Sequence, residues 1–322
     1  MEGQKANEKN FCGGAFSDWM EVMLTEKCNG RCSWCVDKKG YHPKYHASAK
    51  CLVEKILAAD KKNIILLGGE PTLYEELAYL IGAIRQDRNV YVTTNGSRLT
   101  PRFAADVLTG LTGLNISIHD NNLAENHRIT GIRLDERNLI AAIERIQEAN
   151  IRLNCNLIRG HIDSDDRIRD YVEFAKRLGA QSIRFAELKG DIEQFVDLTS
   201  IYGNRFGINN NPFGLGCQHD AELYGMAVNF RQMCGFQISC RPRPSNPESS
   251  GRKKVLYYDG RIYDGWQMED ERIEIMRTDH AKEIAILEAY KKSVLTADEA
   301  LIKLGIAERK PSPETHAGNC QY

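Results

Sequence analysis

The chain has 322 residues, of which 42% are hydrophobic and 27% are charged, and its formal net charge is −1. This composition is typical of a globular protein with one large domain or two domains. Because 43 basic residues balance 44 acidic ones, no global field attracts nucleic acid or an anionic membrane, and nothing indicates DNA binding. No apolar stretch approaches the ~18 residues of a membrane span, and the N-terminus is too polar for a secretory signal. We therefore expect a cytoplasmic protein without a membrane partner, whose cysteines stay reduced.

Apolar runs typical of strands alternate with amphipathic stretches in the first part of the chain. Strands are predicted at residues 19–25, 63–67, 90–94, 114–119, 152–158 and 182–188. Helical spacing of apolar residues fills the intervals, at 52–59, 73–84, 103–108, 139–146 and 168–175. Six strand–helix repeats predict a parallel sheet with right-handed crossovers, either an open doubly wound sheet or part of a barrel. In both folds the chemistry takes place at the carboxyl ends of the strands.

Residues that start and end helices agree with this pattern. Thr72 and Glu75 have the spacing of a capping box, and Thr100 precedes a proline at a first helical position. Gly179 stands where a C-terminal cap belongs. Beyond the repeats, Asp259–Gly260 lies between alternating apolar residues and predicts a hairpin. Two helices are predicted after it, at 279–292 and 297–304.

Three cysteines lie close together just past the first predicted strand, in the segment CNGRCSWC. They are Cys28, Cys32 and Cys35. A structural zinc site usually takes four ligands as two pairs, whereas an iron–sulfur cube bound by three thiolates keeps one iron open for a small chelating molecule. The alternatives are a zinc site completed by a remote ligand such as His42 or His46, and three unrelated buried cysteines.

The cysteine segment resembles the CxxxCxΦC signature of the radical S-adenosylmethionine (SAM) superfamily, with Trp34 at the aromatic position. LLGGEP at 66–71 resembles the GGEP motif of that superfamily at the end of the second strand. TTNG at 93–96 ends the third strand, and NISIH at 115–119 stands where the family often has a serine or another polar contact. These motifs appear in the order of the superfamily, so the chain is identified as similar to it.

The resemblance implies an α/β fold, a partial (β/α)6 TIM-type barrel with a smaller C-terminal appendage that contains a β-hairpin and helices. Residues 1–18 would be an N-terminal extension, 19–190 the radical SAM core, and 191–322 the appendage that covers the active site. The alternative for the whole chain is a zinc-stabilised binding protein without catalysis.

The resemblance also implies the cofactors and their contacts. Cys28, Cys32 and Cys35 would bind a 4Fe–4S cluster, and SAM would chelate its open iron and be cleaved reductively to a 5′-deoxyadenosyl radical. The implied SAM-binding residues are Trp34, Gly68, Gly69, Glu70, Thr94, Asn95 and Ser117. Each has a structural alternative: a tight turn for the glycines and Asn95, a backbone contact for Ser117, and a place in the core for Trp34. The electron would come from a reducing partner such as a flavodoxin or ferredoxin.

The substrate is less defined by the sequence. IRFAEL at 183–188 and the late hairpin resemble the GTP cyclase of molybdenum-cofactor synthesis. That family has arginines reaching the nucleotide where this chain has Glu21 and Ile65, and its third auxiliary-cluster cysteine corresponds to the region of Gly265 and Trp266. We therefore predict a small polar metabolite or a nucleotide-type substrate, without assigning GTP. The alternative substrate is a peptide or a macromolecular nucleoside.

Further cysteines and histidines carry weaker expectations. Cys217, Cys234 and Cys240, alone or with Cys320, are candidates for an auxiliary iron–sulfur cluster. Their spacing matches no compact ligand pattern, and the favoured alternative is that they are buried small apolar groups. His119 and His161 are candidates for proton transfer or, equally, satisfied structural groups.

Overall fold

The computed structural model describes residues 18–188, 193–196, 229–233, 236–241 and 254–267. By its internal contacts the chain divides into Met1–Glu274 and Ile275–Tyr322, and every described element belongs to the first unit. The helices predicted at 279–292 and 297–304 lie outside the described residues.

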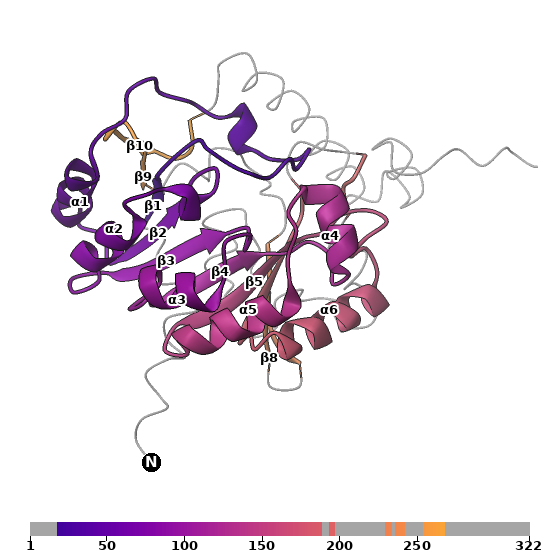
Figure 1. The fold of residues 1–322 in the computed structure, drawn as a ribbon. Coiled ribbons are helices and arrows are strands. Elements are labelled where there is room, and N and C mark those ends of the chain that lie inside the picture. Colours follow the sequence, from indigo (N-terminus) through magenta and orange to yellow (C-terminus); the bar gives the residue numbers. More distant parts are fainter. Residues whose placement is uncertain (1–17, 189–192, 197–228, 234–235, 242–253, 268–322) are drawn as a thin grey trace, which may run out of the picture. The chain divides into compact units, whose positions relative to one another are not determined.

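Six parallel strands form the centre of one sheet (Figure 1). They are β1 (Trp19–Met23), β2 (Asn63–Leu67), β3 (Asn89–Thr94), β4 (Gly113–Ser117), β5 (Asn150–Asn156) and β6 (Ser182–Ala186). Their order across the sheet follows their order along the chain. A doubly wound sheet reverses its strand order, so this arrangement is that of a partial barrel. The six predicted strands and the predicted fold class are confirmed.

Alternation of side chains explains why these segments are strands. Ile64 and Leu66 of β2 are fully buried in the main hydrophobic core, while Ile65 and Leu67 are only half-buried. The same period of two holds in β3 and β5. Side chains of alternate residues point to opposite faces of a strand, so one face of the sheet packs on the helices and the other does not.

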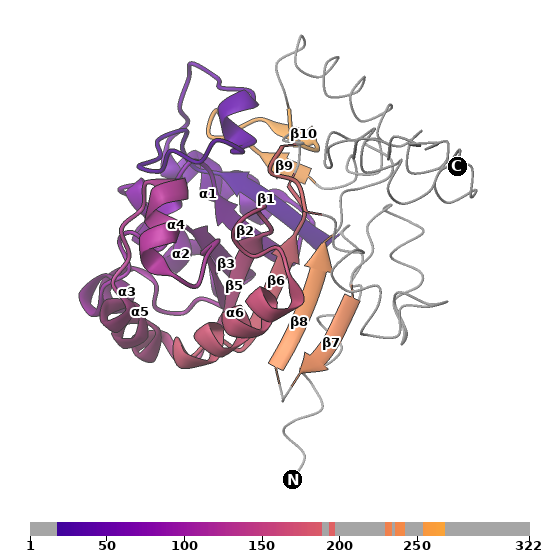
Figure 2. The ribbon, with the colours of Figure 1, turned by 90° about the vertical axis from the view of Figure 1, so that its right-hand side faces the viewer.

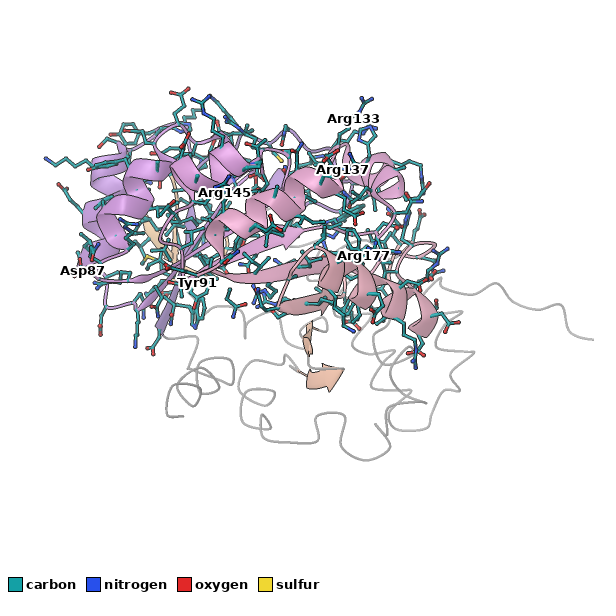
Figure 3. The ribbon with its side chains drawn as sticks, turned by 60° about the horizontal axis from the view of Figure 1, so that its bottom comes forward. Asp87, Tyr91, Arg133, Arg137, Arg145 and Arg177 are labelled. Carbon is teal, nitrogen blue, oxygen red and sulfur yellow. The ribbon has the colours of Figure 1, made fainter. Side chains whose placement is uncertain are left out.

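The helices bury their apolar faces in the same core. They are α1 (Ala49–Ala58), α2 (Leu77–Ile84), α3 (Pro101–Val107), α4 (Leu123–Thr130), α5 (Glu136–Ile143) and α6 (Asp165–Arg177), with 3₁₀ turns at Asp37–Lys39, Pro71–Leu73 and Glu144–Ile146. Their outer sides are charged, and Figure 3 shows Arg137, Arg145 and Arg177 projecting from α5, the turn that follows it and α6. No helix in the part of the chain that the structure describes combines the length and apolar character that a membrane crossing requires.

Helix α4 was not predicted, because it has no apolar stripe. Its fully buried residues are Asn126 and Thr130, and both are polar. The residues that could have predicted this helix lie at its two ends. The Asn122 side chain accepts hydrogen bonds from the backbone N–H groups of the first turn, and Gly131 follows the last turn with φ of +75°. These are the preferred N-cap and C-terminal residues of a helix.

Two of the predicted helix ends are confirmed and one is wrong. Thr100 caps α3 through its side chain, and Gly179 follows α6 with φ of +81°. The capping box of Thr72 and Glu75 does not form, because α2 begins only at Leu77. The Thr72 hydroxyl instead donates to the Glu70 carboxylate at 2.6 Å.

A hairpin extends each edge of the central sheet (Figure 2). The predicted one forms from β9 (Lys254–Leu256) and β10 (Ile262–Asp264), and β9 runs parallel to β1. The other, from β7 (Asn229–Met233) and β8 (Phe236–Arg241), places β8 parallel to β6 and was not predicted. The central sheet is therefore extended at both edges by segments from far along the chain.

The cap of α3 gives a direct test of the helical layer. Thr100 Oγ1 accepts a hydrogen bond from the Phe103 N–H at 3.1 Å. Thr100→Ala removes this acceptor, and we expect the free energy of unfolding to fall by about 1 kcal/mol. Urea denaturation followed by circular dichroism measures the change. Thr100→Ser keeps the hydroxyl and is the control; equal stability of the two variants would contradict the assigned cap.

Candidate functional site

The cysteine loop, residues 24–36, leaves β1 at its carboxyl end and is bounded by the ends of the neighbouring strands. Leu24 continues the pairing of β1 by donating its N–H to the Leu67 carbonyl at 2.8 Å. Cys28 is exposed, and Cys32 and Cys35 are half-buried. All three thiols therefore lie at the end of the sheet where a parallel α/β fold places its chemistry.

The glycines at the end of β2 are in contact with this loop through the backbone. The Gly69 N–H donates to the Thr25 carbonyl at 2.7 Å, and the Glu70 N–H donates to the Lys27 carbonyl at 2.8 Å. A Cβ atom on Gly69 would lie 2.4 Å from the Lys27 carbonyl oxygen. Gly68 has φ of +148°, and its Cβ would lie 2.5 Å from the Thr25 carbonyl oxygen. Only glycine at both positions allows so close an approach.

The Glu70 carboxylate connects the ends of β2 and β3. It is 1% exposed. Its Oε1 accepts from the Thr72 N–H at 3.1 Å and from the hydroxyls of Thr72 and Thr94, both at 2.6 Å, while Oε2 accepts from the Asn95 N–H at 2.7 Å. Four donors compensate the cost of burying this charge. Glu70 and Thr94 are thus held against each other within the predicted SAM site.

Asn95 extends the same network to the cysteine loop. Its Nδ2 donates to Asn29 Oδ1 at 2.8 Å, and Asn29 Nδ2 donates to Ser97 Oγ at 2.9 Å. Asn29 directly follows Cys28, so the end of β3 is bonded to the residue beside the first thiol. Sequence reasoning missed Asn29. An asparagine between the first two cysteines gives no signal until its partner in the next strand is known.

The other side of the loop packs on α4 and on the ends of β5 and β6. The Arg31 N–H donates to the Thr130 carbonyl at 2.7 Å, at the end of α4. Trp34 is buried in a small cluster with Ile158 and Leu188. The loop is therefore fixed from both sides of the barrel opening.

The three thiols interact electrostatically. Burial, followed by the proximity of Cys35 and Cys28, raises the pKa of Cys32 to about 11. Burial also raises the pKa of Cys28, while the Gly30 N–H, which donates to its Sγ at 3.3 Å, opposes the shift. Thiolates this close together favour a cationic partner, and three thiolates with an N–H directed at sulfur suit an iron–sulfur cluster.

The zinc alternative needs a further ligand from the histidines nearby, and these contact other groups. His42 Nε2 lies 2.8 Å from the Asp37 carbonyl oxygen, and the His46 ring stacks on Tyr258. Within the described residues, no three His, Cys, Asp or Glu side chains converge on a point for a single metal ion. In a cube each thiolate binds a different iron, so the three sulfurs need not converge.

His119 lies just past the end of β4, next to the cysteine loop. It is 7% exposed and makes an edge-to-face contact with Trp34, with 5.5 Å between the ring centroids. Its Nδ1 accepts a hydrogen bond from the Asn156 N–H at 3.0 Å, and its own N–H donates to Asn126 Oδ1 at 2.8 Å. Burial lowers its pKa from 6.5 to about 4, so the ring is neutral near pH 7.

His161 is the other histidine considered for proton transfer. Its Nδ1 lies 2.6 Å from Asp120 Oδ2, and its Nε2 lies 3.1 Å from Arg128 Nη2. Because Arg128 can only donate, Nε2 accepts and Nδ1 donates to the carboxylate. Both ring nitrogens are therefore engaged in a structural link between α4 and the end of β5.

The remaining predicted residues lie at the same strand ends or outside the described region. Ser117 ends β4 and is half-buried. Cys240 lies on β8, where its backbone pairs with Phe185, whereas Cys217 and Cys234 lie outside the described residues. The SAM contacts of Trp34, Gly68, Gly69, Glu70, Thr94, Asn95 and Ser117 stay predictions, although the structure brings the first six around the cysteine loop.

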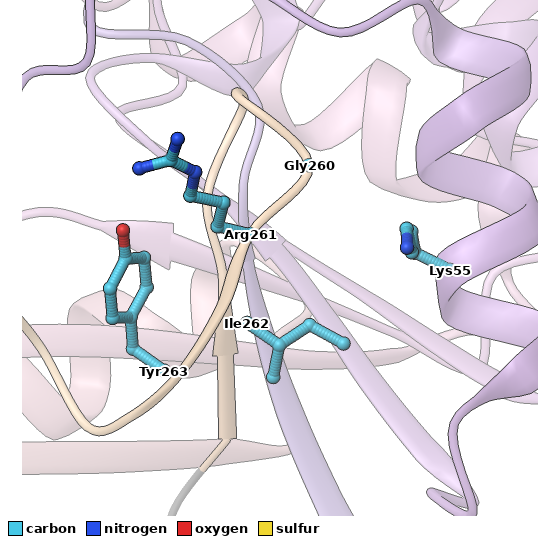
Figure 4. Close-up of a pocket in the computed structure, with 5 residues that line it drawn as sticks. All are labelled: Lys55, Gly260, Arg261, Ile262 and Tyr263. Atoms are coloured by element: carbon cyan, nitrogen blue, oxygen red, sulfur yellow. The ribbon is translucent and has the colours of Figure 1, made fainter.

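A surface hollow of about 540 Å³ lies between α1 and the late hairpin (Figure 4). It is lined by Lys55, Gly260, Arg261, Ile262 and Tyr263. These residues belong to α1 and to the late hairpin, and none of them is a predicted site residue. The candidate site is therefore defined by the contacts of the cysteine loop and not by this hollow.

The family comparison agrees with the geometry of the loop. A model described as the Radical SAM superfamily matches residues 22–175, from β1 to α6. This part of the chain belongs to the radical SAM superfamily. The cofactors expected from the sequence, a 4Fe–4S cluster and SAM, are those that this superfamily uses.

Two curated relatives that match this region are GTP 3′,8-cyclases. A GTP 3′,8-cyclase of Edwardsiella ictaluri is 30% identical over 186 residues, which cover 53% of this chain and 54% of the relative. A GTP 3′,8-cyclase of Pasteurella multocida is 28% identical over 228 residues, 66% of each chain. The chain thus spans about half to two thirds of the length of these relatives.

Solved structures share the fold. SuiB of Streptococcus suis bound to S-adenosylmethionine has a TM-score of 0.52 at 15% identity, with 77% of this chain and 60% of that chain covered. The enzyme anSMEcpe with bound AdoMet and the Cp18Cys peptide has a TM-score of 0.50 at 15% identity, with 77% and 76% covered. These likenesses show that the chain shares the fold of these two proteins.

Gly69 allows a test of the contact between β2 and the cysteine loop. In Gly69→Ala the new methyl group must displace the backbone at Lys27, so we expect the variant to bind little iron after anaerobic reconstitution. Gly82→Ala is the matched control, because a Cβ there meets nothing within 4 Å. Iron and sulfide analysis measures the outcome. Full iron content in Gly69→Ala would contradict the close approach.

The neutral His119 predicts a pH dependence of stability. The pKa of His119 is about 4 in the folded protein, below the value of 6.5 in the unfolded chain. Between these two pH values the unfolded chain binds the proton and the folded protein does not, so the free energy of unfolding falls as the pH drops from 6.5 to about 4. When the pH is lowered from about 7 to 4.5, the free energy of unfolding of the wild-type apo protein should fall by roughly 2–3 kcal/mol more than that of His119→Asn. Urea unfolding at the two pH values measures the difference. Equal losses would show that His119 titrates normally.

Proposed function

We propose that this protein is a radical SAM enzyme acting on a small polar or nucleotide-type substrate. The observation that carries the proposal is the cysteine loop held in backbone contact with Gly68, Gly69 and Glu70. This contact holds the segment with the three thiols directly beside the end of β2, because neither glycine has a side chain to keep the two backbones apart. The match of residues 22–175 to the superfamily supports it independently.

The chain's own residues divide into three roles in this proposal. Cys28, Cys32 and Cys35 hold the cluster. The end of β2 at Gly68–Glu70 would contact the amino-acid part of SAM, and the Glu70 network fixes the positions of Thr94 and Asn95. When bound, the cluster would supply the single electron for reductive cleavage of the C5′–S bond of SAM, with methionine as the leaving group and a 5′-deoxyadenosyl radical available to abstract a hydrogen atom from the substrate.

The substrate class is inferred from the side chains on the sheet face opposite the helices. Ile151, Leu153 and Cys155 of β5 are buried in the helical core, so Arg152 and Asn154 lie on the opposite face. Arg152 Nε donates to Asn154 Oδ1 at 3.2 Å, and Arg184 of β6 pairs with Asn154 across the strands. Amide and guanidinium groups on one face favour a polar substrate with oxygen acceptors, and the curated relatives act on a nucleotide by name.

The edge of the sheet at β1 departs from the pattern of the GTP cyclase family that the sequence resembles. Glu21 is 9% exposed, and its carboxylate accepts a hydrogen bond from Trp266 Nε1, just beyond β10. Ile65 lies directly opposite Glu21 in β2. The GTP cyclase family that the sequence resembles has arginines at the positions of Glu21 and Ile65, and an auxiliary-cluster cysteine near that of Trp266. A carboxylate there repels phosphate, so we do not include GTP bound through its triphosphate in the proposal.

The electron is proposed to come from a reducing protein partner such as a flavodoxin or ferredoxin. A low-potential donor is needed because the cluster must reduce a sulfonium compound. This partner remains a proposal that follows from the chemistry.

The central test of the proposed function removes one thiol. Cys32→Ala should abolish 5′-deoxyadenosine formation from SAM under dithionite, because an iron of the cube loses its protein ligand. Liquid chromatography with mass detection measures the product. Cys51→Ala is the control, since Cys51 is a half-buried cysteine of α1 outside the loop, and this variant should keep wild-type product formation.

Two outcomes would contradict the proposal. One is product formation by Cys32→Ala at the wild-type rate. The other is a colourless wild-type protein that binds one zinc ion after anaerobic purification. The substrate class has its own test, in which deuterium should be transferred from a deuterated nucleoside or nucleotide into 5′-deoxyadenosine. Deuterium transfer from a peptide alone would contradict the proposed substrate class.

A further inference from the structure

The chain between the third cysteine and α1 runs along the late hairpin (Figure 1). We call residues 37–48 the post-cysteine segment. The Tyr41 N–H donates to the Gln267 carbonyl at 3.0 Å, and the Ala47 N–H donates to the Tyr258 carbonyl at 2.7 Å. Between these bonds the His46 ring stacks on Tyr258, with 4.6 Å between the ring centroids. The hairpin region therefore holds this segment at two points along its length.

One end of the post-cysteine segment contacts the cysteine loop. Lys38 Nζ donates a hydrogen bond to the Cys32 carbonyl oxygen at 3.1 Å. Lys38 is exposed, Cys32 is half-buried and Cys28 is exposed. The backbone of a proposed cluster ligand is thus bonded to a cationic side chain at the protein surface.

The hairpin turn connects the post-cysteine segment to α1. A Cβ atom on Gly260 would lie 3.4 Å from the Ala47 Cβ and 3.6 Å from the Cys51 Sγ, so the turn lies against both elements. The hollow of about 540 Å³ includes this turn, with Lys55 on one side and Arg261 on the other (Figure 4). The three elements therefore form one continuous surface.

Exposed cations gather on this surface, which we call the basic surface. They come from the post-cysteine segment, from α1 and from the hairpin turn, and they are Lys38, Lys44, Lys50, Lys55 and Arg261. Of the acidic residues described in and beside these elements, Glu54 is exposed, whereas Glu26, Asp37 and Asp259 are half-buried. A local excess of exposed cations attracts and orients an acidic partner, even though the whole chain is nearly neutral.

Large apolar side chains are exposed on the same elements. Tyr45 of the post-cysteine segment is 69% exposed, and Ile262, just after the hairpin turn, is 41% exposed. Tyrosine is enriched in protein interfaces, because its ring buries a large area while its hydroxyl keeps a hydrogen bond. An exposed tyrosine within a basic surface therefore favours a protein partner that carries acidic groups.

The position of the basic surface indicates which partner it fits. The bond from Lys38 to Cys32 places one end of the surface beside the thiols proposed to bind the cluster. A cluster that must reduce a sulfonium compound needs a low-potential electron donor. Nucleic acid is also acidic, but Glu54, four residues from Lys50 on α1, would repel a phosphate backbone. The surface thus suits an acidic protein that carries electrons.

We infer that the basic surface is the docking site of a small acidic electron-carrier protein, whose reduced cofactor delivers one electron to the cluster of the cysteine loop. The carrier's cofactor is oxidised by one electron and the cluster is reduced by one electron. This inference rests on the proposed function, since it locates on this chain the reducing partner that the chemistry needs.

Charge reversal on the basic surface tests the docking site. Lys44→Glu combined with Lys50→Glu changes two exposed residues outside the cysteine loop, and a glutamate in the first turn of α1 suits the helix dipole. Arg137→Glu combined with Arg145→Glu makes the same change of charge on the exposed side of α5 and the turn that follows it. This second pair is the matched control. Calorimetric titration of the reconstituted holoenzymes with oxidised flavodoxin, at low and at high salt, measures the affinity without turnover.

The two double variants should behave differently. We expect the Lys44→Glu/Lys50→Glu protein to bind flavodoxin about tenfold more weakly at low salt, and the difference should shrink at high salt, which screens the charges. The Arg137→Glu/Arg145→Glu protein should stay within about twofold of the wild type. Dithionite needs no docking surface, so 5′-deoxyadenosine formation with dithionite should be equal in all three proteins.

Tyr45 provides a comparison that does not depend on charge. Tyr45→Ala should weaken flavodoxin binding by about fivefold, because the complex loses the area buried by the ring. Tyr79→Ala removes a side chain of the same kind from α2, where it is 51% exposed, and should leave the affinity unchanged.

Three results would overturn the inference: unchanged flavodoxin affinity in Lys44→Glu/Lys50→Glu, equal weakening in both double variants, or no measurable complex of the wild type with flavodoxin. Binding of single-stranded RNA that is lost in Lys44→Glu/Lys50→Glu, with flavodoxin binding unchanged, would assign the surface to nucleic acid and also overturn it. Each of these results leaves dithionite-driven 5′-deoxyadenosine formation by the wild type in place. Absence of that product would instead contradict the proposed function.

Discussion

The structure depends on two backbone hydrogen bonds that hold the cysteine loop against the end of β2. They run from Gly69 to Thr25 and from Glu70 to Lys27. Both glycine positions lack the space for a Cβ atom, so the distance between loop and strand is set by the backbones themselves. The segment that carries the thiols is therefore positioned by the sheet through backbone contacts.

The buried Glu70 carboxylate spreads this constraint over the neighbouring strand. It accepts four hydrogen bonds, and its partner Thr94 ends β3 while Asn95 follows that strand. Asn95 then bonds Asn29, which brings the network back to the loop. Because a partly satisfied buried carboxylate is costly, the network favours a single arrangement of β2, β3 and the cysteine segment. A cofactor site built on such an arrangement is largely pre-formed.

The sequence predicted the parts of the fold in which local pattern and tertiary packing agree. The six strands were found because apolar residues recur at the period of the pleat, and Thr100 and Gly179 marked helix ends through their own chemistry. Helix α4 was missed because its buried residues are polar, and the capping box at Thr72 failed because the Glu70 carboxylate takes that hydroxyl. The cysteine triplet was readable from spacing alone, whereas Asn29 and the ring proton of His119 are defined by partners that lie 66 and 37 residues away. Such pairings exist only once the strands are assembled.

The cluster that the cysteine loop is proposed to bind would keep one iron open for the amino group and carboxylate of SAM. Electron–nuclear double resonance of the reduced holoenzyme with SAM labelled with ¹⁵N in the amino group and ¹⁷O in the carboxylate measures this contact most directly. The account predicts hyperfine coupling of both labels to the cluster. A reduced cluster that shows no coupling to either label in the presence of saturating SAM would contradict it.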